Sequence, residues 1–157
     1  MSTDSNFKTL VGIVIQAEVY GKPRHELLLE LGATPKTLLQ AGGQQFEDLD
    51  LIIKAKTIGK MYFDHNVPKG MIERLPEILE SPKAIYHSAS GSKGGAIVVM
   101  TFEVQRGYPL IVPIHANRPI GRNRFCNEVA SMYAKEGPNP EEKWEKAGLL
   151  VWKSQAK

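Results

Sequence analysis

One short segment in the C-terminal half of the chain combines a histidine with a cluster of arginines. In VPIHANRPIGRNRF, His115 is followed by Arg118, Arg122 and Arg124. An imidazole can move a proton near neutral pH, and guanidinium groups stabilise the extra negative charge of a phosphoryl transition state. A surface histidine beside a solvated basic loop fits the same pattern. The segment is therefore a candidate phosphate site, with the solvated loop as the alternative.

A second histidine, His65, stands in FDHNVP just before the proline that opens a predicted helix. It could act as an acid or a base if folding brings the sheet close to it. It could equally be a turn residue that bonds to the backbone. Ser88 closes a predicted strand and carries no specific signal of its own. Because the histidines lie far apart in the sequence, folding must assemble any site that uses them.

A third group of polar residues lies in RFCNEVASMYAKEG, residues 124–137, which we predict to be a helix. At helical spacing, the apolar stripe consists of Phe125, Val129, Met132 and Tyr133. The polar row on another face consists of Arg124, Asn127, Ser131 and Lys135. A solvated helix face is the ordinary explanation, but asparagine and serine are only middling helix formers. Their presence slightly favours a face that binds a substrate.

The sequence lacks the common motifs for bound metals and nucleotides. It has no phosphate-binding glycine loop followed by lysine, no paired cysteines and no two histidines spaced for one metal. We therefore expect no cofactor and no metal. The single cysteine, Cys126, excludes an intrachain disulfide and is predicted to pack as a small hydrophobe. A reducing compartment is the matching expectation.

Length and composition predict one soluble domain. The chain has 157 residues, and a hydrophobic content of 42% suffices to bury a core without disulfides or metals. No apolar run approaches the ~20 residues of a membrane helix, and the N-terminus lacks a secretory pattern. The net charge of +3 permits association with phosphate-rich partners without identifying one.

The N-terminal half is predicted to be mainly helical. We expect a helix within residues 7–21, where the β-branched content leaves a strand as the alternative, a helix over 35–41, and a helix between Pro68 and Pro82 that is kinked or restarted at Pro76. For the second of these helices, Thr34 is the expected N-cap and Pro35 the first helical residue. Short strands are expected within residues 26–31 and 48–56, the latter leading into a helix over 57–65.

The C-terminal half is predicted to be mainly a sheet. Three successive strands over residues 83–88, 95–104 and 108–116 favour an antiparallel meander. After the predicted helix at 124–137, Asn139 caps a further helix that ends at Gly148, and residues 149–153 form a closing strand. The expected fold class is α+β: small N-terminal helices, then an antiparallel sheet of about four strands with a helix packed on one face.

Several blocks of the chain resemble, in order, those of the phage MuF C-terminal domain family. The blocks are GATPKTLLQAGG, DLDLIIKAKTIGKMYFDHNVPKGMIERLPEILESPKAIYHS, GYPLIVPIHANR, NEVASMYAKEG and GLLVWKSQAK. The specific feature is the order of their motifs, which are K…DH, LPEILESP, a serine, P-apolar-H and NEVASMY. The resemblance covers about residues 27–157, so residues 1–26 become an N-terminal helical extension of a single domain, 1–157. That family is grouped with the barnase, EndoU, colicin and RelE-like nuclease fold of prophage and polymorphic toxins.

The resemblance implies a ribonuclease-like fold and RNA cleavage without a metal. Its pattern positions map onto His65, Ser88, Asn127, Ser131 and Tyr133. Family members usually form the tail of a larger phage head or toxin protein, whereas this chain begins at Met1 and is expected to lack a delivery domain. The implied partners are RNA, with tRNA among the targets, and an immunity or antitoxin protein. The expected location is the cytoplasm, either of the producing cell or, after delivery, of a target cell.

The residue patterns and the family resemblance together predict cleavage by transesterification, in which a ribose 2′-OH attacks the adjacent phosphate. His65 and His115 are the base and the acid in either order, while Arg118 and Arg124 stabilise the phosphorane. The full set of predicted catalytic residues is His65, His115, Arg118 and Ser131. The predicted substrate-binding residues are Ser88, Arg122, Arg124, Asn127 and Tyr133.

Two alternatives stay open at the level of sequence. A non-catalytic phage structural module could use the three arginines to hold nucleic acid or a protein, and it would show salt-sensitive binding without turnover. ADP-ribosyl transfer is the other alternative. It would require NAD and an ordered series of Arg, Ser-x-Ser and Glu, for which the sequence has no convincing match.

Overall fold

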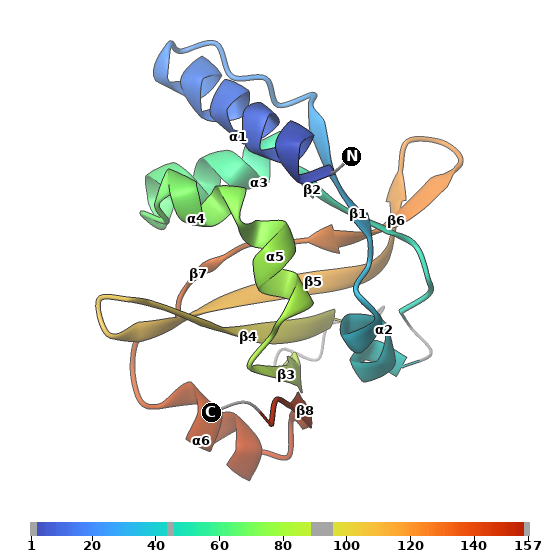
Figure 1. The fold of residues 1–157 in the computed structure, drawn as a ribbon, viewed down its shortest axis with the longest axis vertical. Helices are drawn as coiled ribbons and strands as arrows, with labels where there is room; N and C mark the ends of the chain where they lie inside the picture. Colours follow the sequence, from blue (N-terminus) through green and yellow to red (C-terminus); the bar gives the residue numbers. More distant parts are fainter. Residues whose placement is uncertain (1–2, 44–45, 89–95, 156–157) are drawn as a thin grey trace.

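A mixed sheet of eight strands runs through the middle of the molecule (Figure 1). The computed structural model describes residues 3–43, 46–88 and 96–155. The strands are β1 (Leu28–Ala33), β2 (Asp50–Lys54), β3 (Ala84–His87), β4 (Ala96–Gln105), β5 (Tyr108–Ile120), β6 (Arg124–Val129), β7 (Tyr133–Ala134) and β8 (Leu150–Lys153). Their order is β1-β2-β6-β5-β4-β3-β8, and β7 pairs with β5. All pairs are antiparallel except β2 with β6, which is parallel.

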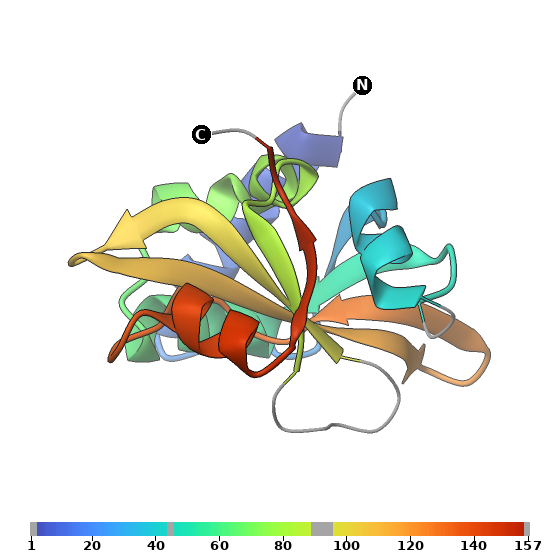
Figure 2. The same ribbon diagram turned by 90° about the horizontal axis from the view of Figure 1, so that it is seen from below.

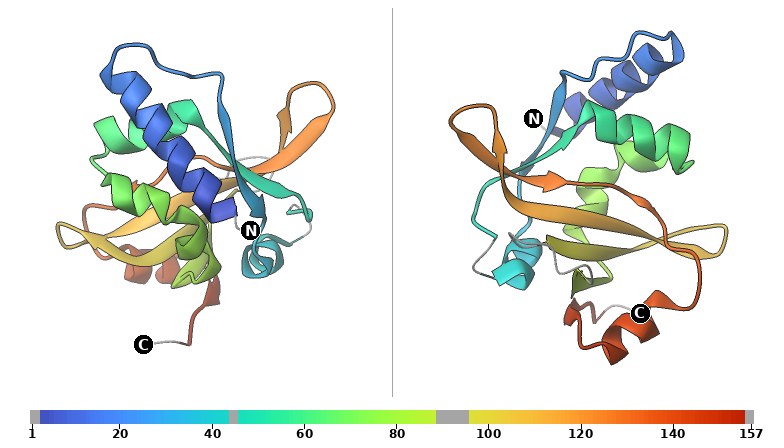
Figure 3. Two further views of the ribbon diagram at one scale, coloured as in Figure 1. Left: turned by 45° about the horizontal axis from the view of Figure 1, so that its top comes forward. Right: turned by 180° about the vertical axis from the view of Figure 1, so that it is seen from behind.

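Helices lie on both faces of this sheet. They are α1 (Thr3–Val19), α2 (Lys36–Gly42), α3 (Ala55–Gly59), the π-helical turn η2 (Lys60–Asp64), α4 (Lys69–Glu73), α5 (Leu75–Glu80) and α6 (Pro140–Lys146). Viewed from below, α5 lies above the sheet and α6 lies beneath it (Figure 2). The sheet therefore has a helical face, covered by α1, α3, α4 and α5, and a reverse face that, among the helices described, only α6 covers in part (Figure 3).

Alternation along β5 divides the buried side chains between the two faces. Leu110, Val112 and Ile114 join the main core with α1, α3, α4 and α5, whereas Ile111 joins a smaller cluster that contains Trp144 of α6. Successive strand residues point to opposite faces, so the polar residues in register with Ile111 lie on the reverse face. Because α6 is short, part of that face stays open beside it.

Most predicted elements are confirmed. The structure has the N-terminal helix, the break between α4 and α5, the β3-β4-β5 meander and the closing strand β8. Asn139 caps α6 as expected, because its side chain accepts hydrogen bonds from the N–H groups of Glu141 and Glu142. The sheet has eight strands rather than about four, and its helices are not confined to one face.

The helix predicted for residues 124–137 is wrong. Residues 124–129 form β6, which lies between β2 and β5 and pairs with both, and residues 133–134 form β7. Four consecutive residues, 126–129, are buried because a central strand is covered on both faces. Pairing with the two neighbouring strands overrides the helical preference of these residues. The apolar residues that mimic one helical stripe are divided between the two faces of the sheet.

Thr34 does not cap α2 as predicted. The N-cap position belongs to Pro35, and no side chain caps this helix. The hydroxyl of Thr34 instead donates to the carbonyl oxygen of Leu49 at 2.6 Å. Thr34 thus joins β1 to the segment that leads into β2.

Candidate active site

A histidine and a glutamate lie side by side on the reverse face of the sheet. The register of β5 and β6 places His115 directly opposite Glu128. Directly opposed residues of antiparallel strands share a face, with Cβ atoms roughly 5 Å apart. Glu128 is an ionisable residue in a strand that lies between β2 and β5, and only 12% of its side chain is exposed. The pair therefore places an imidazole and a carboxylate within reach of one small group.

Two cations flank the carboxylate of Glu128. The Nζ atom of Lys54 lies 3.7 Å from Oε2, and the Nε atom of Arg118 lies 3.9 Å from Oε1. Lys54 reaches this place because Ile52 pairs with Glu128 and strand residues two apart point the same way. Both cations are about half exposed, so they remain open to a ligand on the solvent side. We call His115, Glu128, Arg118 and Lys54, as candidate catalytic residues, the catalytic cluster.

A bulge in β5 aims Arg118 at this cluster. His115 pairs with Glu128 and Arg118 with Cys126, so β5 uses one residue more than β6 between these pairs. Asn117, in the bulge, has a φ of 54°, a conformation that asparagine tolerates better than most residues. Its N–H donates to Oδ1 of Asn127 at 3.0 Å.

Asn127 anchors the bulge from the buried side of β6. Its Nδ2 donates to Oγ1 of Thr34 at 2.9 Å and to the carbonyl oxygen of Glu47 at 3.1 Å, and its side chain is fully buried. All these contacts lie inside the protein, on the face opposite the catalytic cluster. Asn127 therefore positions the site and does not face a ligand.

The electrostatics of His115 follow from its surroundings. Burial lowers the pKa of this imidazole, the positive charge of Arg118 lowers it further, and the carboxylate of Glu128 partly opposes both. The proton of an imidazolium at this place is consequently held weakly and is easily donated.

A cavity of about 510 Å³ opens beside the cluster, between α6 and the sheet. Its apolar lining includes Val98, Ile111, Pro113, Trp144 and Leu149, and its polar lining consists of Ser88, His115, Tyr133, Lys135 and Lys143. We call it the α6 cavity. It brings together three residues predicted from the sequence, namely Ser88, His115 and Tyr133.

His65 lies elsewhere, in a second hollow of about 350 Å³. This His65 hollow is lined by Asp64, His65, Asn66, Arg106, Tyr133, Ala134, Lys135 and Glu136. The rings of His65 and Tyr133 are 5.5 Å apart between centroids. Tyr133 pairs with Ile111 of β5. Ile111 precedes His115 by four residues, so the backbones of these two residues are about 13 Å apart along the strand. The structure therefore does not bring the two histidines to one phosphate.

The remaining predicted residues also lie apart from the cluster. Arg124 forms a two-pronged hydrogen bond with Glu30, at 2.9 Å to each oxygen, and lies 3.5 Å from Asp50. The hydrogen bonds to Glu30 and the charge of Glu30 raise the pKa of Arg124. The contacts of Arg124 with Glu30 of β1 and Asp50 of β2 join β6 to both strands. Arg122 is exposed at the turn of the β5–β6 hairpin, and Ser131 follows β6 without lining either hollow.

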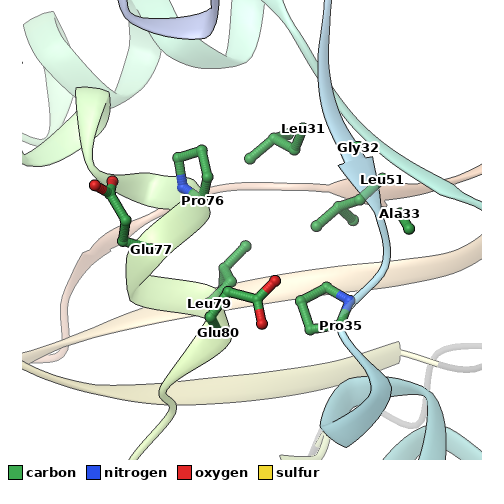
Figure 4. A pocket seen from close by; sticks show the side chains of 9 residues that line it. All are labelled: Leu31, Gly32, Ala33, Pro35, Leu51, Pro76, Glu77, Leu79 and Glu80. Atoms are coloured by element: carbon green, nitrogen blue, oxygen red, sulfur yellow. The ribbon is translucent and has the colours of Figure 1, made fainter. Parts of the chain in front are cut away.

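A third cavity, of about 290 Å³, lies on the helical face between β1 and α5 (Figure 4). Glu77 and Glu80 are the charged residues of its lining, and the others are apolar or glycine. Two carboxylates at a cavity repel a phosphate-rich ligand. The basic residues of the reverse face make that face the better site for such a ligand.

Comparison with known proteins decides the family. A model of the phage MuF-C-terminal domain matches residues 56–157, the greater part of the chain. The chain belongs to the phage MuF C-terminal domain family. In this MuF C-terminal domain the matched region includes His115, Arg118 and Glu128, whereas Lys54 precedes it. Searches of curated proteins and of solved structures found no match.

Sequence reasoning missed Glu128 and Lys54 in this MuF C-terminal domain. The available signal was the acidic residue of CNEVA, which stands among Cys126, Val129 and Ala130 with one asparagine beside it, since a buried carboxylate requires a partner. The helical interpretation hid it, because in a helix Glu128 shares the polar face of Arg124, Ser131 and Lys135 and resembles an ordinary solvated carboxylate. In the described part of the chain, no helix is long and apolar enough to cross a membrane, and no three metal-ligating side chains are grouped.

Proposed function

We propose that the protein is an endoribonuclease that cleaves RNA without a metal, by transesterification at the catalytic cluster. The observation that carries this proposal is the Glu128–His115 pair, flanked by Arg118 and Lys54 on an open sheet face. A base, an acid and two cations around one small space are the groups that phosphodiester transesterification requires. Membership of a phage domain family agrees with this proposal without specifying an activity.

The proposed first step uses Glu128 as the base. Its carboxylate takes the proton of a ribose 2′-OH, and the oxygen attacks the adjacent phosphorus. The P–O bond that forms makes a phosphorane whose added negative charge is stabilised by the guanidinium of Arg118 and the ammonium of Lys54. Both cations can turn from the carboxylate toward the phosphate because both side chains are half exposed.

The proposed second step uses His115 as the acid. Its imidazolium donates a proton to the 5′-oxygen as the P–O bond to that oxygen breaks, which leaves a 2′,3′-cyclic phosphate and a free 5′-OH. The lowered pKa of His115 suits this donation, because a weakly held proton transfers readily. The role of His115 agrees with the sequence-based expectation, whereas Glu128 replaces His65 as the second proton-transfer group.

The chemical groups at the new ends of the RNA fragments test this proposed function. Purified protein is incubated with total RNA in EDTA, and the new 3′ ends are examined for 2′,3′-cyclic phosphates. Cyclic ends on RNA, with single-stranded DNA left intact, support the proposal because DNA lacks the attacking hydroxyl. Salt-sensitive binding with no new ends would contradict it and favour the non-catalytic phage module.

A toxin role is the wider biological proposal. If the enzyme cuts cellular RNA, its expression arrests bacterial growth, and an immunity or antitoxin protein encoded nearby restores growth. Arrest by wild type and normal growth with Glu128→Gln, at equal protein levels, would link the arrest to the cluster. Equal arrest by both proteins would remove the link.

A further inference from the structure

We infer that the α6 cavity and the His65 hollow are consecutive subsites for one single-stranded RNA, and that His65 stacks on a base there. The inference rests on the proposed function for its substrate class. Residues outside the catalytic cluster thereby bind the additional nucleotides of a longer substrate and take no part in bond cleavage.

Tyr133 and Lys135 line both hollows. They belong to β7 and the residue after it, and the N–H of Lys135 donates to the carbonyl oxygen of Pro109 at 2.8 Å, which fixes this segment on β5. In Figure 1 and in the right-hand view of Figure 3, β7 lies between α4 and α6. The two hollows therefore adjoin along one side of β5 and are not separate sites.

The lining of the α6 cavity fits a nucleotide with its base inside and its phosphate at the rim. Trp144, Val98 and Leu149 offer apolar surface on which a base can pack. Lys135 and Lys143 supply positive charge for the phosphate at the edge. His115 lines the same cavity, so a nucleotide held there would lie next to the scissile bond.

The His65 hollow fits an uncharged base better than a phosphate. Of its charged residues, Arg106 pairs with Glu136 at 3.4 Å, and Asp64 offsets Lys135. The charge is therefore balanced, while the tilted rings of His65 and Tyr133 offer flat surface. Unstacked bases of single-stranded RNA bind aromatic rings in this way, whatever their identity.

The position of His65 is also held firmly. Its carbonyl oxygen accepts a hydrogen bond from Nε2 of Gln105 at 3.4 Å, and its N–H donates to the carbonyl oxygen of Lys60 at 3.0 Å. The first bond joins the end of η2 to β4, and the second closes the η2 turn itself. A base bound beside His65 would thus meet a preformed surface and would not have to order a loop.

The test compares short and longer substrates. A dinucleotide fills the cleavage centre and the α6 cavity, whereas a tetranucleotide also reaches the His65 hollow. His65→Ala should lower kcat/KM for the tetranucleotide at least about fivefold, the loss of one weak stacking contact, and leave the dinucleotide unchanged. His65→Phe should restore the tetranucleotide rate, because phenylalanine stacks but cannot transfer protons. His25→Ala, an exposed histidine paired with Glu18, is the control.

Two outcomes would overturn the inference. If His65→Ala slows the dinucleotide equally and His65→Phe fails to rescue, His65 is catalytic. If neither substrate distinguishes His65→Ala from wild type, the hollow binds no base.

A binding measurement separates this inference from the proposed function. A 2′-O-methyl tetranucleotide cannot be cleaved by transesterification, and its affinity is measured by fluorescence anisotropy. His65→Ala should weaken binding at least about fivefold, and Lys135→Ala should reduce the slope of log affinity against log salt by about 0.7. Loss of affinity without any cleavage by wild type would retain the subsites and refute the ribonuclease. Unchanged affinity in both variants would refute the subsites even if RNA is cleaved.

Discussion

The side chain of Asn127 accepts the N–H of Asn117 at 3.0 Å across the β5 bulge. This hydrogen bond connects the buried face of β6 to the strand that carries His115 and Arg118. A polar side chain in the core therefore holds the bulge that lies between His115 and Arg118. The relationship leads directly to a prediction about stability.

Asn127→Ala should lower the free energy of unfolding by about 1–3 kcal/mol or more, because it leaves the Asn117 N–H without its partner in the interior. Urea denaturation of both proteins measures this difference. Asn139→Ala, which removes an exposed helix cap, should cost only about 1 kcal/mol. A smaller loss for Asn127→Ala than for Asn139→Ala would show that the buried network contributes little.

His115 should titrate below the ordinary histidine pKa of 6.5, since burial and Arg118 both disfavour its charged form. NMR titration of the four histidines measures this directly. Arg118→Ala should move the pKa of His115 upward, and Glu128→Gln should move it downward. As His115 is the proposed acid, kcat/KM should fall as pH rises through its pKa. A rate that rises through the same interval would assign His115 as a base.

Arg118→Ala should lower kcat about 100-fold, because one charged donor to the phosphorane is lost. Arg118→Lys should recover part of this loss by restoring the charge without the planar fork. The control is Arg24→Ala, since the Arg24 side chain is 52% exposed against 51% for Arg118 and pairs with a neighbouring glutamate. Steady-state cleavage of a defined RNA supplies the measurement, and equal rates for the two alanine variants would contradict the proposed role.

Tyr86→Phe should stabilise the protein by about 1 kcal/mol near neutral pH, because the hydroxyl is buried without a hydrogen-bond partner among the described residues. Burial, together with the charges of Glu141 and Glu145, raises the pKa of Tyr86 to about 12 from its ordinary 10. The unfolded chain therefore loses this proton first, and the stability that depends on it is complete below pH 10 and lost between pH 10 and 12.

Urea unfolding at pH 8, 10 and 11 tests the prediction for Tyr86. The decline above pH 10 should be shallower in Tyr86→Phe than in wild type, while Tyr20→Phe, at an exposed tyrosine, should follow wild type. Parallel declines in all three proteins would assign the alkaline instability to other groups.

Elements with strong local signals could be predicted from the sequence. The strands around Val99 and Val112 are rich in β-branched residues, glycine-containing segments of the sequence flank them, and α6 begins with an asparagine cap followed by proline. These signals act within a few neighbouring residues. Local reasoning therefore found the meander and α6 at nearly their observed positions.

The interior of the sheet could not be predicted in the same way. β6 became a strand because β2 and β5 leave room between them, and this depends on residues some 75 positions apart, such as Leu51 and Asn127. Without that pairing, the sequence could not show that Glu128 and His115 share a face. Half of the proposed cluster, Glu128 and Lys54, was consequently missed.

The most direct test of the account is the rate of RNA cleavage in EDTA by Glu128→Gln, compared with wild type and with Glu73→Gln. Glu73 is a matched control because its side chain is 11% exposed, against 12% for Glu128, and it pairs with Lys69 on the helical face. We predict that Glu128→Gln is at least about 100-fold slower than wild type, with its fold intact, and that Glu73→Gln keeps its activity. Cleavage by Glu128→Gln at the wild-type rate would contradict the central claim.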